Sequence, residues 1–116
     1  MLFRSLKRHE YQVAKRNFLR TVEIDPDQMI AYVNLGTVCL ETGEYAEAIA
    51  YSQRVLELDP RSIRGRYNLA VALFASGRLD EAIRQFQSLV TLLPDDAEAR
   101  QNLARALALK AGSAPK

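Results

Sequence analysis

Residue types that commonly carry catalysis or bind metal ions are few and scattered in this sequence. His9 is the single histidine and Cys39 the single cysteine, and the two lie far apart in the chain. A multi-histidine metal site, a multi-thiolate zinc site, a Cys/His dyad and an internal disulfide are therefore not expected. We expect His9 to be an exposed turn residue. Cys39 falls on an apolar helix face, where a buried thiol behaves as a small inert hydrophobe.

The remaining catalytic patterns are no stronger. Asp95 and Asp96 pair two carboxylates, but they directly precede a predicted helix at Ala97, where aspartate commonly serves as an N-cap. Glycine-rich phosphate loops, nucleophile elbows and Cys-x-x-Cys motifs are absent. The sequence therefore predicts a protein that is not an enzyme, with no cofactor and no metal.

Three asparagines offer a different chemistry, hydrogen bonding to a ligand. Asn34, Asn68 and Asn102 each precede a leucine, and consecutive copies are 34 residues apart. Their carboxamides both donate and accept hydrogen bonds, so a column of them could pair with the backbone of an extended peptide. They could equally bond to the backbone of an adjacent helix and tie the structure together. The sequence leaves both interpretations open.

The same interval relates many other residues, which indicates stacked repeats of one structural unit. Pro26, Pro60 and Pro94 keep it, as do Gly43 and Gly77. Within one period the apolar residues follow helical spacing twice, over 32–39 and again over 45–56. Glycine supplies the left-handed residue that ends the first helix, and proline stops the second. Each period is therefore helix, tight turn, helix.

This periodicity predicts seven helices. The first is short, and His9 takes the turn position that glycine occupies later. Small residues at Gly36, Ala70 and Ala104 are expected where helices approach closely. The predicted helices lie near 2–8, 11–24, 28–42, 45–58, 62–76, 79–92 and 96–111.

The pattern resembles the tetratricopeptide repeat (TPR) family. The repeat 29–62 matches the family pattern at Tyr32, Leu35, Gly36, Gly43, Tyr45, Ala48, Ile49 and Pro60. The repeat 63–96 matches at Leu69, Ala70, Gly77, Leu79, Ala82, Ile83, Phe86 and Pro94. One departure is Arg66, which stands where the family usually has its first aromatic residue.

The resemblance implies an all-α, right-handed solenoid of antiparallel helix pairs, with about three repeats and a C-terminal capping helix. The expected domain covers 1–111. It divides into a partial repeat 1–28, repeats 29–62 and 63–96, and a capping helix 97–111. A disordered tail, 112–116, would follow.

The resemblance also implies a function. TPR domains are protein–protein interaction modules and scaffolds, and the first helix of each pair lines a concave groove. We expect this groove to bind an extended or short helical peptide segment of a partner. The expected peptide-binding residues are Asn34, Asn68, Asn102, Val33, Thr37, Arg64, Tyr67, Val71 and Arg105.

Two binding patterns found in particular TPR families, an inner asparagine column and a carboxylate clamp, involve residues at these positions. The asparagine column is similar to the inner asparagines of the TPR arrays of O-linked N-acetylglucosamine transferases. The Lys/Asn/Asn/Lys/Arg clamp that grips chaperone carboxylates is incomplete here, since in one register Glu98 stands where a cation belongs. That mechanism is not expected.

An alternative role is self-association, or assembly as a structural segment of a larger TPR protein. The predicted short first helix leaves Leu2, Phe3 and Leu6 with little cover, and the last helix leaves Leu107 and Leu109 at an open edge. Solenoids with open ends tend to stack end to end.

Charge and hydropathy restrict the partners and the location. The net charge is only +2, and the basic opening of the chain is followed by a stretch, 41–59, with five acids against Arg54. Nucleic acid is therefore not an expected partner. No apolar run reaches the roughly 18 residues that a membrane span requires. With a single cysteine and no secretory pattern at the N-terminus, we expect a cytoplasmic protein.

Overall fold

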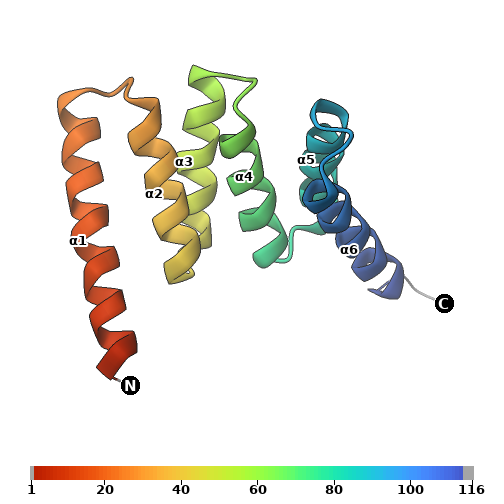
Figure 1. Cartoon of the computed structure of the whole chain (residues 1–116), viewed down its shortest axis with the longest axis horizontal. Helices are drawn as coiled ribbons and strands as arrows, with labels where there is room; N and C mark the ends of the chain where they lie inside the picture. The colour runs from red at the N-terminus through yellow and green to blue at the C-terminus, as the bar shows by residue number, and fades with distance from the viewer. Residues whose placement is uncertain (1, 114–116) are drawn as a thin grey trace.

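The structure, a computed structural model, describes the backbone of residues 2–113 and the side chains of residues 7–112 (Figure 1). All regular structure in this range is helical. The helices are α1 (Leu2–Ile24), α2 (Met29–Thr42), α3 (Tyr45–Leu58), α4 (Ile63–Ala75), α5 (Leu79–Leu92) and α6 (Ala97–Ser113). Each packs against the next in the sequence, and α2 also contacts α4 directly.

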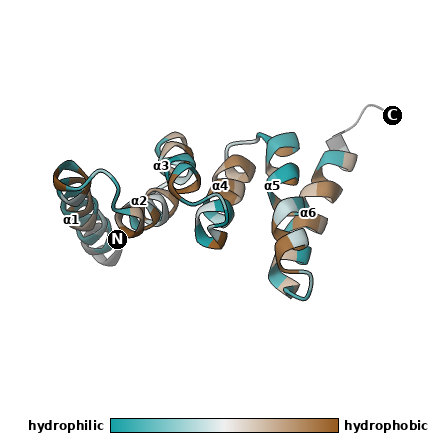
Figure 2. Ribbon diagram, turned by 90° about the horizontal axis from the view of Figure 1, so that it is seen from above, coloured by the Kyte–Doolittle hydropathy of each residue, from teal (hydrophilic) through white to brown (hydrophobic). Residues whose placement is uncertain are grey.

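The helices form a row rather than a bundle around one centre. The radius of gyration is 15.4 Å, whereas a compact domain of this length would have about 13 Å. Figure 2 views the row from above, with α1 to α4 nearly end-on and α5 and α6 more from the side, so the helix axes rotate along the row. The predicted all-α solenoid of helix pairs with a final capping helix is confirmed.

Two glycines make the turns within the helix pairs, as predicted. Gly43 has φ 77° and Gly77 has φ 84°, both in the left-handed region. After Gly43, the Glu44 N–H donates to the Cys39 carbonyl at 2.8 Å, and after Gly77 the Arg78 N–H donates to the Leu73 carbonyl at 2.9 Å. These bonds satisfy carbonyls that each helix end would otherwise leave without a partner.

The N-terminal helix corrects the prediction of two helices, 2–8 and 11–24. The structure has one continuous helix of 23 residues, and His9 lies exposed within it rather than at a turn. No glycine or proline occurs between residues 2 and 24. Nothing therefore favours a left-handed residue at position 9, and the unbroken helix keeps every backbone hydrogen bond.

The C-terminal helix also differs from the prediction. It continues to Ser113, past the expected end at 111, and residues 114–116 of the predicted tail lie outside the described residues. Ala104, expected at a close helix contact, is exposed, because no second helix packs on that face of α6. The side chains of Leu2, Phe3 and Leu6 also lie outside the described residues.

The core lies between α2 and α6. Its most deeply buried side chains include Leu35, Cys39, Ala48, Val55, Ala70, Ala82, Phe86 and Leu89. Among the described side chains, none from α1 is fully buried. The first helix is also the least hydrophobic of the six, and α2 is the most hydrophobic.

Two buried glycines allow close helix contacts. A Cβ at Gly36 would lie 3.3 Å from both Asn68 Nδ2 and Ser52 Oγ. A Cβ at Gly65 would lie only 2.5 Å from Val55 Cγ1. The contact at Gly36 was predicted from the repeat register, whereas the tighter one at Gly65, between α4 and α3, was not. No helix in the described range is long and apolar enough to cross a bilayer.

Candidate binding groove

Three adjoining pockets lie along α2, α4 and α6, which alternate in sequence with the outer helices α3 and α5. The first, of about 410 Å³, lies between α2 and α4 and is lined by residues that include Thr37, Leu40, Tyr67 and Val71. The second, of about 150 Å³, lies between α4 and α6. The third, of about 230 Å³, lies beside the start of α6. Tyr67 lines all three, so we treat them as one surface, the inner groove.

Tyr67 is held in place by the capping helix. Its hydroxyl donates a hydrogen bond to Glu98 Oε1 at 2.7 Å. Burial of the half-covered ring and this bond raise the pKa of Tyr67, so the phenol remains a protonated donor well above neutral pH. Glu98 is exposed, and a ligand in the groove can therefore reach the bonded pair.

Asn68 does not face the groove freely. It is 8% exposed, and its Nδ2 donates to the Val33 carbonyl and to Thr37 Oγ1, each at 3.3 Å. Both protons of the amide are thus used to tie α4 to α2. Gly36 makes room for this contact, because any larger residue there would meet the Asn68 amide. The contacts of Asn68 therefore match the second interpretation of the asparagines, in which the amide bonds to the adjacent helix.

The other two asparagines have different surroundings. Asn34 is half-buried. Asn102 is also half-buried and lines the second pocket beside Tyr67. Its Nδ2 is buried and makes no complete hydrogen bond among the described residues, although the amide lies close enough to the Tyr67 hydroxyl to lower its pKa. A small movement of this side chain would let a ligand carbonyl in the second pocket satisfy the donor.

The remaining expected residues are distributed between the groove and the core. Thr37, Arg64 and Arg105 are exposed, and Val71 is half-buried in the wall shared by two pockets. Val33 is only 4% exposed, because α4 packs directly against α2 over this side chain. The structure therefore moves Val33 from the expected groove to the core.

Sequence reasoning missed several groove residues. Tyr45 and Glu41 line the first pocket, and Phe86 of the outer helix α5 lines the second. Phe86 packs edge-on against Phe74, with ring centroids 6.4 Å apart. Tyr45 and Phe86 match the repeat pattern at positions that usually pack in the core. That match does not show which of these side chains also reaches the groove.

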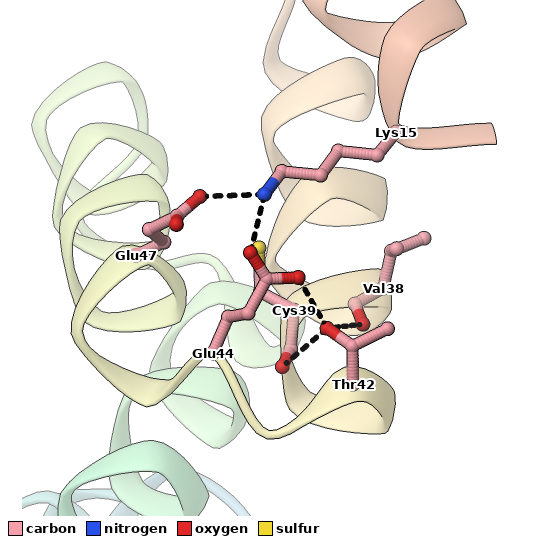
Figure 3. Close-up of polar contacts among 6 residues, drawn as sticks. All are labelled: Lys15, Val38, Cys39, Thr42, Glu44 and Glu47. Carbon is pink, nitrogen blue, oxygen red and sulfur yellow. Dashed lines mark hydrogen bonds and ion pairs between the residues drawn. The ribbon is translucent and has the colours of Figure 1, made fainter. Parts of the chain in front are cut away.

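A polar cluster holds α1 against the next helix pair (Figure 3). Lys15 Nζ lies 2.5 Å from Glu44 Oε2 and 2.7 Å from Glu47 Oε2, and Glu44 also accepts from the Thr42 hydroxyl at 2.6 Å. The hydrogen bonds to these carboxylates raise the pKa of Lys15, and the bond from Lys15 lowers that of Glu44. Because none of the side chains described for α1, from residue 7 onward, is fully buried, this cluster is its most specific attachment.

Cys39 lies next to this cluster (Figure 3) and has no exposed surface. Burial raises the pKa of its thiol to about 11, which keeps it protonated and unreactive at neutral pH. Groups of histidine, cysteine and acidic residues able to hold a metal ion are not found in the described range. The chemistry available in the groove is hydrogen bonding and apolar contact.

Two family models described as tetratricopeptide repeat match the chain, one over residues 5–63 and the other over residues 40–111. A search of curated proteins finds no match.

Solved structures give the same fold. The second TPR domain of human RPAP3, in complex with an HSP70 peptide, is 22% identical with a TM-score of 0.79 and covers 87% of this chain and 84% of that one. The first TPR of Spaghetti (RPAP3), bound to an HSP90 peptide, is 19% identical with a TM-score of 0.83, covering 93% and 88%. An O-GlcNAc transferase of Thermobaculum terrenum is 32% identical with a TM-score of 0.74, covering 86% of this chain but 20% of that one.

Proposed function

The chain belongs to the tetratricopeptide repeat family, and we propose that its inner groove binds an extended or short helical segment of a partner protein. TPR domains are generally non-catalytic protein-interaction modules, and the neighbours described above include domains bound to chaperone peptides. The observation that carries the proposal is the position of Tyr67 in all three pockets of the groove.

The groove has the composition of an interaction surface. Its centre combines the Tyr67 ring with the half-buried apolar side chains of Leu40, Val71 and Phe74. Tyrosine at the centre of a partly desolvated pocket is a frequent interface hot spot. Arg64, in the first turn of α4, and Arg105, in the middle of α6, are exposed, and with Glu98 they form a polar rim.

Two groups define how a peptide backbone would be held. Asn102 Nδ2 provides a donor for a peptide carbonyl beside Tyr67. The Tyr67–Glu98 pair provides an acceptor for a peptide N–H at the carboxylate. Asn68 contributes indirectly, by fixing α4 against α2. We therefore expect recognition of an internal segment rather than of a terminal carboxylate, because the family's carboxylate clamp is incomplete here.

A charge placed in the groove tests the proposal. Val71→Glu puts a carboxylate in the wall shared by the first and second pockets, and Val13→Glu, on the exposed surface of α1, is its matched control. Partners captured by the parent protein are identified, mapped to peptide segments and titrated against both variants. We expect binding to be lost, or weakened at least tenfold, in Val71→Glu alone. Equal binding by parent and both variants, all folded by circular dichroism, would contradict the proposal.

Self-association is the alternative function, and one observation favours it. Leu107 and Leu109 on the last helix are 44% and 52% exposed. Exposed leucines on an open solenoid end favour stacking with a second copy, although these two lie on different sides of α6. Light scattering over a range of concentrations, with Leu107→Glu for comparison, separates the two functions. A parent protein that stays monomeric at tens of micromolar removes this alternative.

The cytoplasmic location also stays a prediction, as does the expectation that nucleic acid is not a partner. Cell fractionation with an epitope-tagged protein tests the first. A gel-shift titration at physiological salt tests the second.

A further inference from the structure

A basic pocket lies outside the inner groove and shares no lining residue with it. It has a volume of about 550 Å³ and lies between the start of α4 and the outer helix α5. Three arginines line it, Arg61, Arg66 and Arg84, together with the hydroxyl residues Ser88 and Thr91. Its lining residues include no aspartate or glutamate.

Arg66 is fixed in this pocket by neutral partners. Its guanidinium donates to Gln85 Oε1 and to the Pro60 carbonyl, each at 2.8 Å. Its Nε is buried and has no hydrogen-bond partner among the described residues. Arg61 and Arg84 are exposed and take part in none of the ion pairs found in the described range. The arginines of the pocket therefore have no carboxylate in direct contact, although Asp80 and Glu81, outside the lining, interact with Arg84 at longer range.

In the preceding repeat, the equivalent position is occupied by aromatic side chains, and its arginine is paired with acidic residues. Tyr32, one period before Arg66, packs against Tyr51 with ring centroids 6.4 Å apart. Arg54 lies over the Tyr32 ring at 5.8 Å and forms ion pairs with Asp27 at 3.2 Å and Glu57 at 3.1 Å. It also donates to the Pro26 carbonyl, the counterpart of Pro60. One cation there is matched by two acids.

One period later both acids are gone. Arg61 stands in register with Asp27, and Thr91 with Glu57, so a carboxylate becomes a cation and another becomes a hydroxyl. Ser88 replaces Arg54, and Arg84 replaces an alanine. The aromatic pair is replaced by Arg66 and Gln85, which are joined by a hydrogen bond of 2.8 Å, and Arg66 lines the open pocket. The site around Tyr32 is occupied by aromatic rings and its arginine is paired with acids, whereas the site around Arg66 is an open pocket lined by three arginines.

We propose that this basic pocket binds an oxyanion of the phosphoryl class. Planar guanidinium groups match tetrahedral oxyanions by paired N–H donors, and the buried Nε of Arg66 supplies a donor that lacks an acceptor. A phosphoryl group carries a charge of about −2 near pH 7, which the positive charge of the three arginines is sufficient to neutralise. The source is either free phosphate or a phosphorylated side chain of a partner.

Arginine side-chain NMR tests the proposal on the intact protein. The Nε–Hε resonances are followed while inorganic phosphate is added at constant ionic strength, and chloride at the same ionic strength is the control. We expect a saturable shift for Arg66. The Arg54 resonance is the internal reference and should not shift, because that guanidinium is already paired with Asp27 and Glu57.

Two exposed substitutions define the site without disturbing the core. Arg61→Gln should weaken phosphate binding roughly fivefold through the loss of one charge-assisted contact. Thr91→Glu restores the carboxylate that Glu57 provides one repeat earlier, and it should abolish saturable binding. Arg66→Tyr, which restores the aromatic residue, should also abolish binding. If that variant fails to fold, the two surface variants still decide the question.

A third titration distinguishes the sources of the anion. A short glycine-rich peptide with one phosphoserine is compared with its unphosphorylated form and with inorganic phosphate. Tighter binding of the phosphopeptide than of phosphate assigns the pocket to a phosphorylated partner, and equal binding assigns it to free phosphate. Both results support the proposal. Shifts that are linear and equal with chloride, or that persist unchanged in Thr91→Glu, overturn it.

Discussion

Replacing Gly65 by alanine tests the packing that positions the inner groove. Gly65 is buried in the first turn of α4, and an added Cβ would lie 2.5 Å from Cγ1 and 3.0 Å from Cβ of Val55. Val55 has no exposed surface and belongs to α3. Carbon atoms in contact prefer about 3.5–4.0 Å. Either Val55 or the whole of α4, which carries Tyr67 and Asn68, must move.

The expected cost follows from two opposing terms. Overpacking of this kind costs about 1–3 kcal/mol, and alanine is better than glycine in a helix by about 0.5–1 kcal/mol. We expect Gly65→Ala to lower the free energy of unfolding by about 1–2 kcal/mol. Val55→Ala alone should cost about 2 kcal/mol, from two lost methyl groups and the resulting cavity. In the Val55→Ala background the 2.5 Å contact with Cγ1 is gone but the 3.0 Å contact with Cβ of residue 55 remains, so Gly65→Ala should cost about 1 kcal/mol less there than in the parent.

Urea denaturation followed by far-UV circular dichroism measures all four members of this cycle. The Gly65→Ala midpoint should fall by about 1 M at an unchanged slope, and Gly112→Ala is the matched control. No atom lies within 4 Å of a Cβ at Gly112, so that variant should be neutral or slightly stabilised. Equal destabilisation by Gly65→Ala in both backgrounds would refute the steric explanation.

Three further predictions concern single contacts. Lys15→Met should cost about 1–2 kcal/mol, because it removes a cation that is 14% exposed and leaves Glu44 and Glu47 without their shared partner. Alkylation of the buried Cys39 should quicken as α1 loosens, and an unchanged alkylation rate would argue against this. Asn68→Ala should cost about 1–2 kcal/mol by removing the two hydrogen bonds that tie α4 to the Val33 carbonyl and the Thr37 hydroxyl of α2, and thermal unfolding measures it, with Asn34→Ala as the comparison that should change less. The free energy of unfolding should fall in alkali, because the pKa of Cys39 is about 11 in the folded protein and about 8.5 in the unfolded chain; the contribution is complete below about pH 8.5 and is lost as pH rises toward 11. It should also fall in acid, because the lowered pKa of Glu44 gives a contribution that is present above about pH 4.3 and is lost as pH falls below it. A free energy of unfolding that stays constant over both ranges would contradict both statements.

The repeat period predicted the fold because it reports on local geometry. Gly43 and Gly77 sit at left-handed turns, and the helices from α2 to α5 begin and end within one residue of the predicted bounds. The prediction failed at His9, where the period suggested a turn but no residue in the local sequence could form one. The repeat register predicted a turn at this position from the family pattern, but the backbone conformation depends on the residue that is present, which here is histidine.

The groove was harder to predict from sequence. Register places Asn68 on an inner helix, but it does not give the distance from α4 to α2. That distance decides whether the amide meets a ligand or the Val33 carbonyl at 3.3 Å. The same limit applies to Val33, whose burial depends on the helix packed over it. In contrast, the departure at Arg66 was visible in sequence, although its pocket also requires Arg84 from the following helix.

The unbroken α1 is a long helix at one end of the molecule, and part of it projects beyond the neighbouring helices. At 1.5 Å per residue, α1 is roughly 35 Å long and α2 roughly 21 Å, and its N-terminal part projects past the turn between α2 and α3 (Figure 1). A sideways pull on that projecting end turns the whole rod about the point where Lys15 grips the neighbouring pair. Force there acts on two ion pairs and on half-buried apolar side chains such as Phe18 and Leu19, so α1 should separate as a rigid helix before the fully buried core of the other helices opens.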